Sequence, residues 1–427
     1  MIHHFHTLHI LLLKGAVIST DTRNLPSGCI FFALRGERYD ANTFAEEALR
    51  SGAAAVVTER KDLDGKPGYL IVDNSLATLQ QFSAFHRKTL RIPVLAIGGS
   101  NGKTTTKELV GAVLQKKYNT AVTKGNLNNH IGVPLTLLSI TSEHEFAVVE
   151  IGANHLLETA FLSELVQPDY GLVTNNGKDH LEGFGSLEGV KKANAELFDW
   201  LKTNGGEAFV NADDADLMEE SAGLKRITYG QSQGANMQGE PTQGSVFSEV
   251  YLTDGTLIRS SLFGQYNFPN LMAAITIGKC FGVPDADIVA AITEYRPGLN
   301  RSQVSEVGSN TVIFDCYNAN PSSMKAAIES FVQMKADNPV LILADMLEMG
   351  EHAENEHKAM LDYIGTTGIN RVILTGPEFK KADTENRYIV FDATAETKQW
   401  LQKNPIENST VLLKGSRGYK LEQLFVG

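Results

Sequence analysis

A glycine-rich segment near residue 100 is the clearest candidate for chemistry. It follows the apolar run Ile92–Ile97 and consists of Gly98, Gly99, Ser100, Asn101, Gly102, Lys103, Thr104 and Thr105. Glycines let a backbone wrap around a phosphate, and the helix that we expect from Thr105 or Thr106 adds positive charge there. In such loops the lysine reaches the outer phosphates and the next hydroxyl holds Mg²⁺. The segment predicts a phosphate site, although the strict motif has glycine where Ile97 stands; the alternative is a plain glycine-rich turn.

Two polar residues follow later strand-like runs. Glu150 comes at the end of FAVVE, and His180 ends the segment TNNGKDH. Ligands bind at the carboxyl ends of strands in open α/β sheets, and Mg²⁺ prefers oxygen ligands. Each residue also has an ordinary interpretation. Glu150 could cap a helix or form a salt bridge, and His180 could be a metal ligand, a proton carrier or a buried structural histidine.

A fourth polar segment, DCYNANP at 315–321, follows a predicted strand and begins a helix. Asn320 suits the N-cap and Pro321 the first helical position. Capping therefore explains part of the pattern. Asp315 and Asn318 remain for hydrogen bonds to a ribose or a substrate.

The elements that must position these residues fall into three α/β blocks, for which we predict domains at 1–89, 90–297 and 298–427. The first has two short buried runs and reads as a small α/β domain. The second alternates strands and helices, which predicts a mostly parallel sheet with a P-loop ATPase site, and Asp254-Gly255 predicts an antiparallel hairpin at its edge. The third predicts a Rossmann-like, doubly wound sheet.

Bulk properties exclude several classes of protein. The 427 residues carry a net charge of -12, which argues against nucleic-acid binding. No apolar stretch reaches the ~18 residues of a membrane span, so we expect no membrane insertion. Cys29, Cys280 and Cys316 lie far apart, which favours a reducing cytoplasm over a disulfide framework. We expect a monomer.

Taken together, the motifs resemble the Mur ligases over essentially the whole chain. The segments that carry the resemblance are STDTR (19–23), FFALRGERYD (31–40), GGSNGKTTTKE (98–108), TKGNLNN (123–129), IGVP (131–134), YNFPNLMAA (266–274), YNANP (317–321), ADMLEMG (344–350) and LKGSR (413–417). Within the family, YNANP is most similar to the branch that joins D-alanyl-D-alanine to UDP-N-acetylmuramoyl-tripeptide.

The resemblance implies roles for individual residues. The catalytic residues would be Lys103, Glu150 and His180, and the magnesium ligands Thr104, Glu150 and His180. ATP would contact the loop at 98–105, Asn270, Arg301 and Asp315. The substrates would contact Thr20, Asp21, Thr22, Arg23, Phe32, Arg38, Asn126, Asn128, Asn129, Tyr317, Asn318, Asn320, Lys414, Ser416 and Arg417.

The chemistry implied by the family is ligation that consumes ATP and needs Mg²⁺. The tripeptide carboxylate attacks the γ-phosphate of ATP and becomes an acyl phosphate, which the amine of D-alanyl-D-alanine then attacks. Two alternatives stay open. One is a sibling amide ligase, such as a folate polyglutamate-adding enzyme, and the other is a nucleotide-binding relative without enzyme activity.

One position departs from the family pattern. Family members present a lysine, carbamylated by CO₂, that supports the second Mg²⁺, whereas this chain has Asn194 there. An asparagine offers a carbonyl oxygen but no negative charge. A bound anion or water could replace the carbamate, the helix register could shift so that Lys192 serves, or the second metal site could be weaker. We favour the first hypothesis because the other motifs are intact.

Overall fold

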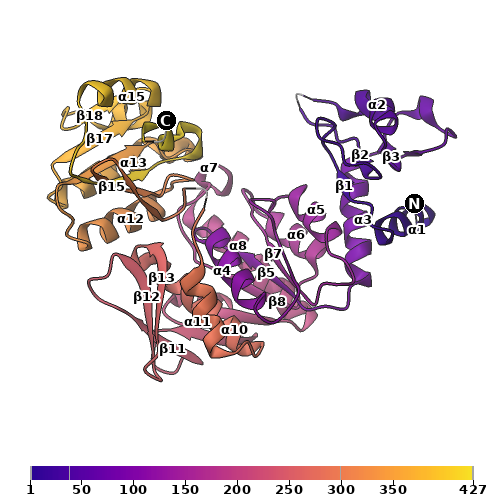
Figure 1. The fold of residues 1–427 in the computed structure, drawn as a ribbon, viewed down its shortest axis with the longest axis horizontal. Coiled ribbons are helices and arrows are strands. Elements are labelled where there is room, and N and C mark those ends of the chain that lie inside the picture. The colour runs from indigo at the N-terminus through magenta and orange to yellow at the C-terminus, as the bar shows by residue number, and fades with distance from the viewer. Residues whose placement is uncertain (1, 38, 299, 426–427) are drawn as a thin grey trace.

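The computed structural model describes residues 2–37, 39–298 and 300–425, and its strands form three separate sheets (Figure 1). The ribbon forms a crescent, with the first sheet at one tip, the second in the middle and the third at the other tip. The three sheets fall within the three predicted blocks, and the mixed α/β class is confirmed. The domain boundaries themselves stay a prediction.

The N-terminal sheet is small and entirely parallel, in the order β1-β2-β3-β4. Its elements are α1 (Ile2–Leu13), β1 (Ile18–Ser19), β2 (Ile30–Phe32), η1 (Ala41–Phe44), α2 (Ala45–Arg50), β3 (Ala55–Thr58), η2 (Lys61–Leu63), β4 (Tyr69–Ile71) and α3 (Ser75–Thr89). Successive strand residues point to opposite faces. Phe31 and Val56 pack with α2, whereas Phe32 and Val57 pack with α1 and α3. Helices therefore cover both faces.

The central sheet has nine strands in the order β13-β12-β11-β10-β9-β8-β5-β7-β6. The strands are β5 (Val94–Gly98), β6 (Thr120–Val122), β7 (Phe146–Glu150), β8 (Tyr170–Val173), β9 (Glu207–Asn211), β10 (Lys225–Gly230), β11 (Met237–Pro241), β12 (Phe247–Leu252) and β13 (Leu257–Phe263). The chain passes from β5 to β6 and β7 on one side and then to β8 on the other. This switch point beside β5 is where such sheets bind ligands. The predicted hairpin at Asp254-Gly255 is confirmed, since β12 and β13 pair antiparallel at the edge.

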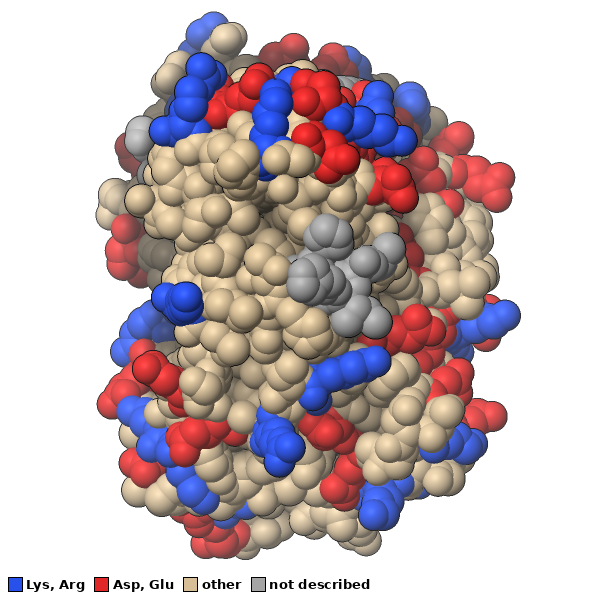
Figure 2. Space-filling model, turned by 90° about the vertical axis from the view of Figure 1, so that its right-hand side faces the viewer, with Lys and Arg blue, Asp and Glu red and all other residues tan. Residues whose placement is uncertain are grey.

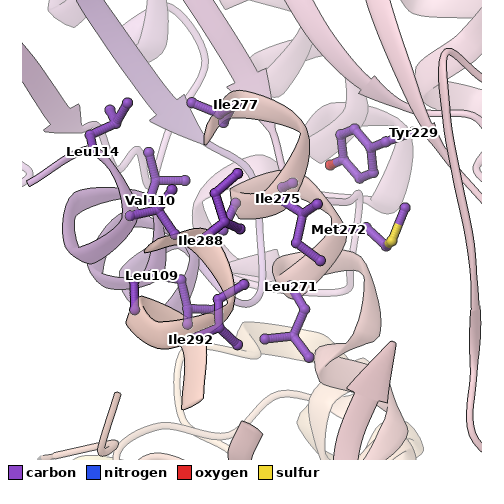
Figure 3. Packing of buried hydrophobic residues seen from close by; sticks show 14 of the residues in the cluster. Leu109, Val110, Leu114, Tyr229, Leu271, Met272, Ile275, Ile277, Ile288 and Ile292 are labelled. Carbon is purple, nitrogen blue, oxygen red and sulfur yellow. The ribbon is translucent and has the colours of Figure 1, made fainter. Parts of the chain in front are cut away.

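The helices of the central region are α4 (Lys103–Leu114), α5 (Gly132–Leu138), α6 (Glu158–Val166), α7 (Leu181–Phe184), α8 (Leu187–Asn204), α9 (Ala215–Glu220), η3 (Gln265–Asn267), α10 (Phe268–Cys280) and α11 (Asp285–Glu294). Figure 3 shows that Leu109 and Val110 of α4 lie against α10 and α11, beside residues such as Leu271 and Ile292. Because α4 begins at Lys103, this core holds the end of the glycine-rich loop in place.

The C-terminal sheet has the order β14-β15-β19-β16-β17-β18, and all its pairs except β14 with β15 are parallel. Its strands are β14 (Gln303–Val307), β15 (Asn310–Phe314), β16 (Pro339–Ala344), β17 (Arg371–Thr375), β18 (Ile389–Phe391) and β19 (Thr410–Lys414). Its helices are α12 (Pro321–Gln333), η4 (Gly350–His352), α13 (Ala353–Thr366), α14 (Pro377–Ala382), α15 (Thr394–Lys403), η5 (Arg417–Tyr419) and η6 (Leu421–Leu424). The doubly wound unit is as predicted, with one antiparallel edge strand.

The side of the molecule at which the N-terminal tip lies carries charges of both signs. On the face that Figure 2 shows, Lys and Arg side chains lie among Asp and Glu side chains, above and below a largely uncharged band. Within residues 2–37, 39–298 and 300–425, no helix has the length and apolar character needed to cross a membrane.

Candidate active site

A cavity of about 580 Å³ lies at the carboxyl ends of the central strands, between the central and C-terminal sheets. The predicted residues that line it are Ser100, Asn101, Gly102, Lys103, Thr104, Thr105, Asn126, Asn128, Asn129, Glu150, His180, Asn270, Arg301, Asp315, Tyr317, Asn318, Asn320 and Lys414. Segments as far apart in the sequence as Ser100 and Lys414 thus line the same cavity. Most of the residues predicted to contact ATP, magnesium and the incoming substrate therefore line the same cavity.

The glycine-rich loop turns sharply into α4. Gly99 and Gly102 have φ of +108° and +82°, values that side-chain-bearing residues rarely adopt. A Cβ at Gly99 would collide with Thr174, and one at Gly102 would lie 2.8 Å from Asn270 Oδ1. The predicted helix start at Thr105 or Thr106 was wrong by two or three residues, because Gly102 in the left-handed region lets the helix begin at Lys103. The first N–H groups of a helix lack partners within it, which suits a phosphate.

The ammonium group of Lys103 lies inside this loop, where Nζ donates to the carbonyls of Gly99 and Ser100. The neighbouring Ser100 Oγ donates to the buried carboxylate of Asp179. The loop thus combines a cation and helix N–H groups, as binding of a phosphate chain requires.

Glu150 is 1% exposed at the end of β7 and is held by two hydrogen bonds. Its Oε1 accepts from Thr104 Oγ (3.1 Å) and from Asn128 Nδ2 (2.8 Å). Its Oε2 is buried without a hydrogen-bond donor in the described part of the chain. An unsatisfied carboxylate oxygen beside a threonine hydroxyl fits Mg²⁺, which takes oxygen ligands. Thr104 and Glu150, which were both predicted as magnesium ligands, thus lie side by side, and their role as ligands stays a prediction.

Lys107 was missed by the sequence reasoning. Its side chain is 1% exposed, and Nζ lies 3.6 Å from Glu150 Oε2 and 3.7 Å from Glu108 Oε1. Nζ also donates to the carbonyl of Gly125 (3.0 Å). Residues three apart on a helix share a face, so a helix start at Lys103 would have placed Lys107 beside Thr104. Lys107 balances the charge of the buried Glu150.

His180 lies at the cavity wall, just before α7, with φ of +46°. Its Nδ1 is 2.8 Å from Oε2 of Glu348, a residue of the loop after β16. This hydrogen bond from His180 holds the pKa of Glu348 below its usual value. Sequence reasoning assigned Glu348 no individual role, although its segment ADMLEMG carried part of the family resemblance.

Asn194 is buried on α8 and does not line the cavity. Its Nδ2 donates to Asn176 Oδ1 (2.9 Å), and Asn176 Nδ2 donates to both carboxylate oxygens of Glu220 (3.0 and 3.1 Å). Burial raises the pKa of Glu220 to about 7. Lys192 is exposed and lies outside the cavity lining, so the structure does not support the hypothesis that a shifted register brings it to the metal site.

The predicted nucleoside contacts lie on both sides of the cavity. Asn270 on α10 packs against Gly102 and accepts a hydrogen bond from Thr106 Oγ (3.0 Å). From the other side, the Arg301 guanidinium stacks on the Tyr317 ring at 3.5 Å, and its Nε is buried without a hydrogen-bond partner in the described chain. A guanidinium group with an unpaired N–H can bind a phosphate or a carboxylate ligand.

Asp315 and Lys414 bind each other. Lys414 Nζ donates to Asp315 Oδ2 (2.7 Å), and the Ser302 N–H donates to Oδ1 (3.0 Å). Lys414 is 3% exposed, so this ion pair fixes the end of β19 against the end of β15. The two residues shape the cavity wall, and both predicted ligand contacts stay predictions.

Three further C-terminal residues were predicted to contact a substrate, and of these Asn320 lines the cavity whereas Ser416 and Arg417 do not. Asn320 caps α12 as expected, forming a capping box with Ser323, and its Nδ2 donates to Asn101 Oδ1 across the cavity (2.8 Å). Ser416 is buried beneath the cavity wall, and Arg417 pairs with Glu422 (2.6 Å). Neither Ser416 nor Arg417 lines the cavity.

The residues predicted for the uridine pocket lie far from the cavity, at the N-terminal tip of the crescent (Figure 1). Thr20, Asp21, Thr22 and Arg23 form the loop after β1, in which the Arg23 side chain holds the pKa of Asp21 down to about 2. Phe32 is fully buried and stacks on Phe82, a position that does not support the predicted substrate contact. Arg38 lies outside the described residues.

Known proteins match this chain along almost its whole length. The Mur ligase middle domain matches residues 97–278, and the Mur ligase, glutamate ligase domain matches residues 300–417. The chain is 34% identical to the UDP-N-acetylmuramoyl-tripeptide--D-alanyl-D-alanine ligase of Escherichia coli (strain K12), over 96% of this chain and 94% of the relative.

Two solved structures have the same arrangement. A MurF from Acinetobacter baumannii superposes with a TM-score of 0.86 at 29% identity, covering 98% of this chain and 97% of that chain. The MurF ligase from Thermotoga maritima in complex with ADP has a TM-score of 0.84 at 25% identity, covering 97% and 96%. The chain therefore belongs to the Mur ligase family. It is an ATP-dependent ligase that forms an amide bond.

Proposed function

We propose that this chain joins D-alanyl-D-alanine to UDP-N-acetylmuramoyl-tripeptide in the synthesis of peptidoglycan precursors. The observation that carries the proposal is the match, over nearly the full length of both chains, to a relative named for that reaction. The cavity supports it, because the phosphate loop, Glu150 and the Arg301 guanidinium, whose Nε has no hydrogen-bond partner in the described chain, surround one space.

The first step activates the tripeptide carboxylate, which is a poor electrophile towards an amine. The carboxylate attacks the γ-phosphate of ATP, so that an acyl phosphate forms and ADP is released. The loop N–H groups and Lys103 bind the phosphates and stabilise the charge that develops during transfer. Thr104, Glu150 and His180 would hold Mg²⁺, which supplies further neutralisation of phosphate charge when bound.

The second step forms the amide bond. The amine of D-alanyl-D-alanine attacks the acyl phosphate, and phosphate leaves. We place the dipeptide beside Tyr317, Asn318 and Asn320, and the uridine nucleotide at Asp21 and Arg23. The cavity walls come from the regions of two sheets, and closure of these regions around the substrates would exclude water, which would otherwise hydrolyse the acyl phosphate.

The proposed setting is the cytoplasm, where we expect a monomer. The cysteines Cys29, Cys280 and Cys316 are free thiols, as suits a reducing compartment. ATP, Mg²⁺ and both peptidoglycan precursors would be available there.

At Asn194 we favour a bound anion or water in place of the carbamate of relatives. We expect turnover of the natural protein to respond to chloride and to be independent of bicarbonate, because an asparagine cannot be carbamylated. The Asn194→Lys variant should gain a bicarbonate requirement. A natural protein that needs bicarbonate and ignores chloride would contradict the anion hypothesis.

The deciding experiment measures phosphate release with ATP, Mg²⁺, D-alanyl-D-alanine and UDP-N-acetylmuramoyl-tripeptide, omitting each component in turn. We expect release that depends on all four. Release with a different carboxylate substrate would point to a sibling ligase. ATP binding without release on any of these substrates would point to a relative without enzyme activity.

A further inference from the structure

The loop after β16 contacts the segment around α7 through a set of hydrogen bonds between the central and C-terminal regions. Glu348 Oε2 lies 2.8 Å from His180 Nδ1. The N–H of Glu182 donates to the carbonyl of Glu348 (3.1 Å), and His352 Nε2 lies 3.2 Å from the carbonyl of Gly185. These three contacts, between residues 180–185 and residues 348–352, fix the two segments against each other.

Apolar packing reinforces this contact. Leu181 and Phe184 of α7 are buried in the same cluster as Met346 and Met349, which flank Glu348 in the chain. The short helix α7 therefore packs into the core of the C-terminal region. Because His180 directly precedes α7, its position depends on where the C-terminal region docks.

Both members of the pair have unusual backbones. His180 has φ of +46° and Glu348 has φ of +64°, in the left-handed region that residues with a side chain seldom adopt. Such conformations persist when the surrounding structure enforces them, and they concentrate at functional sites. Here each strained residue directs its side chain to the other across the interface.

The pairing also determines which histidine nitrogen can bind a metal. The carboxylate of Glu348 accepts the hydrogen of Nδ1, so Nε2 is the nitrogen that keeps a lone pair. His180 Nε2 has no hydrogen-bond partner within residues 2–37, 39–298 and 300–425, and the residue lines the cavity. Histidines that bind metals usually donate their other N–H to a carboxylate or a carbonyl.

We propose that Glu348 is a positioning residue that orients His180 for Mg²⁺, so that docking of the C-terminal region completes the metal site. This inference rests on the proposed function, since it takes His180 as a magnesium ligand. It assigns the C-terminal region a part in binding the metal in addition to its part in binding the incoming amine.

The test measures Mn²⁺ affinity by electron paramagnetic resonance in the full-length protein with a non-hydrolysable ATP analogue, and in parallel the Mg²⁺ dependence of turnover. We expect Glu348→Ala to weaken Mn²⁺ binding roughly tenfold or more, as losses of such partners do. Glu348→Gln keeps an acceptor oxygen and should lose less affinity than Glu348→Ala.

The matched control is Glu356→Gln on α13. Glu356 pairs with Lys178 (2.6 Å) across the same interface but does not contact His180. Because a single partly exposed ion pair contributes little, we expect its Mn²⁺ affinity to stay within roughly twofold of wild type. Circular dichroism on all variants excludes unfolding.

Wild-type Mn²⁺ affinity in Glu348→Ala would overturn the inference even if turnover fell, because Glu348 would then act in docking alone. An equal loss in Glu356→Gln would overturn it too. If the four-component assay fails but Mn²⁺ binding still depends on Glu348, the proposed function falls and the role of Glu348 stands.

Discussion

The cavity and the loop at the N-terminal tip hold their polar residues in different ways. In the cavity, Glu150 is 1% exposed and bound by Thr104, Asn128 and the nearby Lys107. In the N-terminal loop, the Arg23 side chain is 88% exposed, and its ion pair is to Asp21, two residues away. Side chains at buried strand ends are therefore in place before any ligand arrives. A nucleotide bound at the proposed uridine site would have to order the exposed side chains of the loop, at a cost in conformational entropy.

The largest effect that we expect comes from the cavity. Lys103→Met should lower the rate of phosphate release roughly 10²–10³-fold, the usual effect of removing one group that stabilises developing charge. Folding should survive, because the ammonium group donates to loop carbonyls and to no core group. Lys116→Met is the control, since Lys116 pairs with Glu294 outside the cavity. Comparable rates in the two variants would contradict the role of Lys103.

The buried charge pair predicts a loss of stability. Lys107→Met leaves the Glu150 carboxylate buried without its cation, which should lower the free energy of unfolding by about 3–5 kcal/mol. Urea denaturation at pH 7 measures the loss. Adding Glu150→Gln removes the stranded charge and should restore most of the stability. A stability in Lys107→Met equal to that of wild type would show that the cavity tolerates the bare carboxylate.

A smaller effect is expected at the N-terminal tip. Arg23→Ala should raise KM for the uridine substrate about tenfold with little change in kcat, because one charge-assisted hydrogen bond is lost far from the reacting atoms. Steady-state kinetics against that substrate gives both constants. Arg60→Ala is the control, since Arg60 lies in the same N-terminal region and is bound to Asp62 of η2 and Glu46 of α2. A fall in kcat alone would place Arg23 in the chemical step.

The smallest effect is a dependence of stability on pH. The pKa of Glu220 is raised to about 7 in the folded protein, chiefly by burial. A raised carboxyl pKa stabilises the fold below the unfolded pKa, and this stability is lost as pH rises through about 7. The glutamine of Glu220→Gln does not ionise. The free energy of unfolding of this variant, relative to that of wild type, should therefore be higher at pH 8 than at pH 5, by less than about 1 kcal/mol after solvent screening. If the difference in free energy of unfolding between Glu220→Gln and wild type is the same at the two pH values, the prediction is contradicted.

Local patterns in the sequence predicted the parts of the site that depend on neighbouring residues. The glycine-rich loop, the hairpin at Asp254-Gly255 and the N-cap at Asn320 each follow from a few adjacent side chains, and all three are present. Glu150 and His180 both line the cavity, as expected where strand ends of a parallel sheet share one edge, and their roles as metal ligands stay predictions.

What the sequence did not predict depends on contacts between distant segments. Lys107 was overlooked because its partner Glu150 is 43 positions away and the helix start was set too late. Glu348 was not singled out because the docking of the third sheet decides that it meets His180. Phe32 was predicted to contact the substrate, although the alternation of β2 directs its side chain to α1 and α3.

The strand order also determines when, during synthesis, the nucleotide site can exist. The loop at 98–105 is among the early segments of its sheet to leave the ribosome, yet its Ser100 N–H donates to the carbonyl of Asn175 (3.0 Å). Helix α4 is covered by α10, which is made much later. A nascent chain that ends before Phe268 therefore lacks part of the wall that shapes the loop. The growing polypeptide gains its nucleotide site only when most of the central region has emerged.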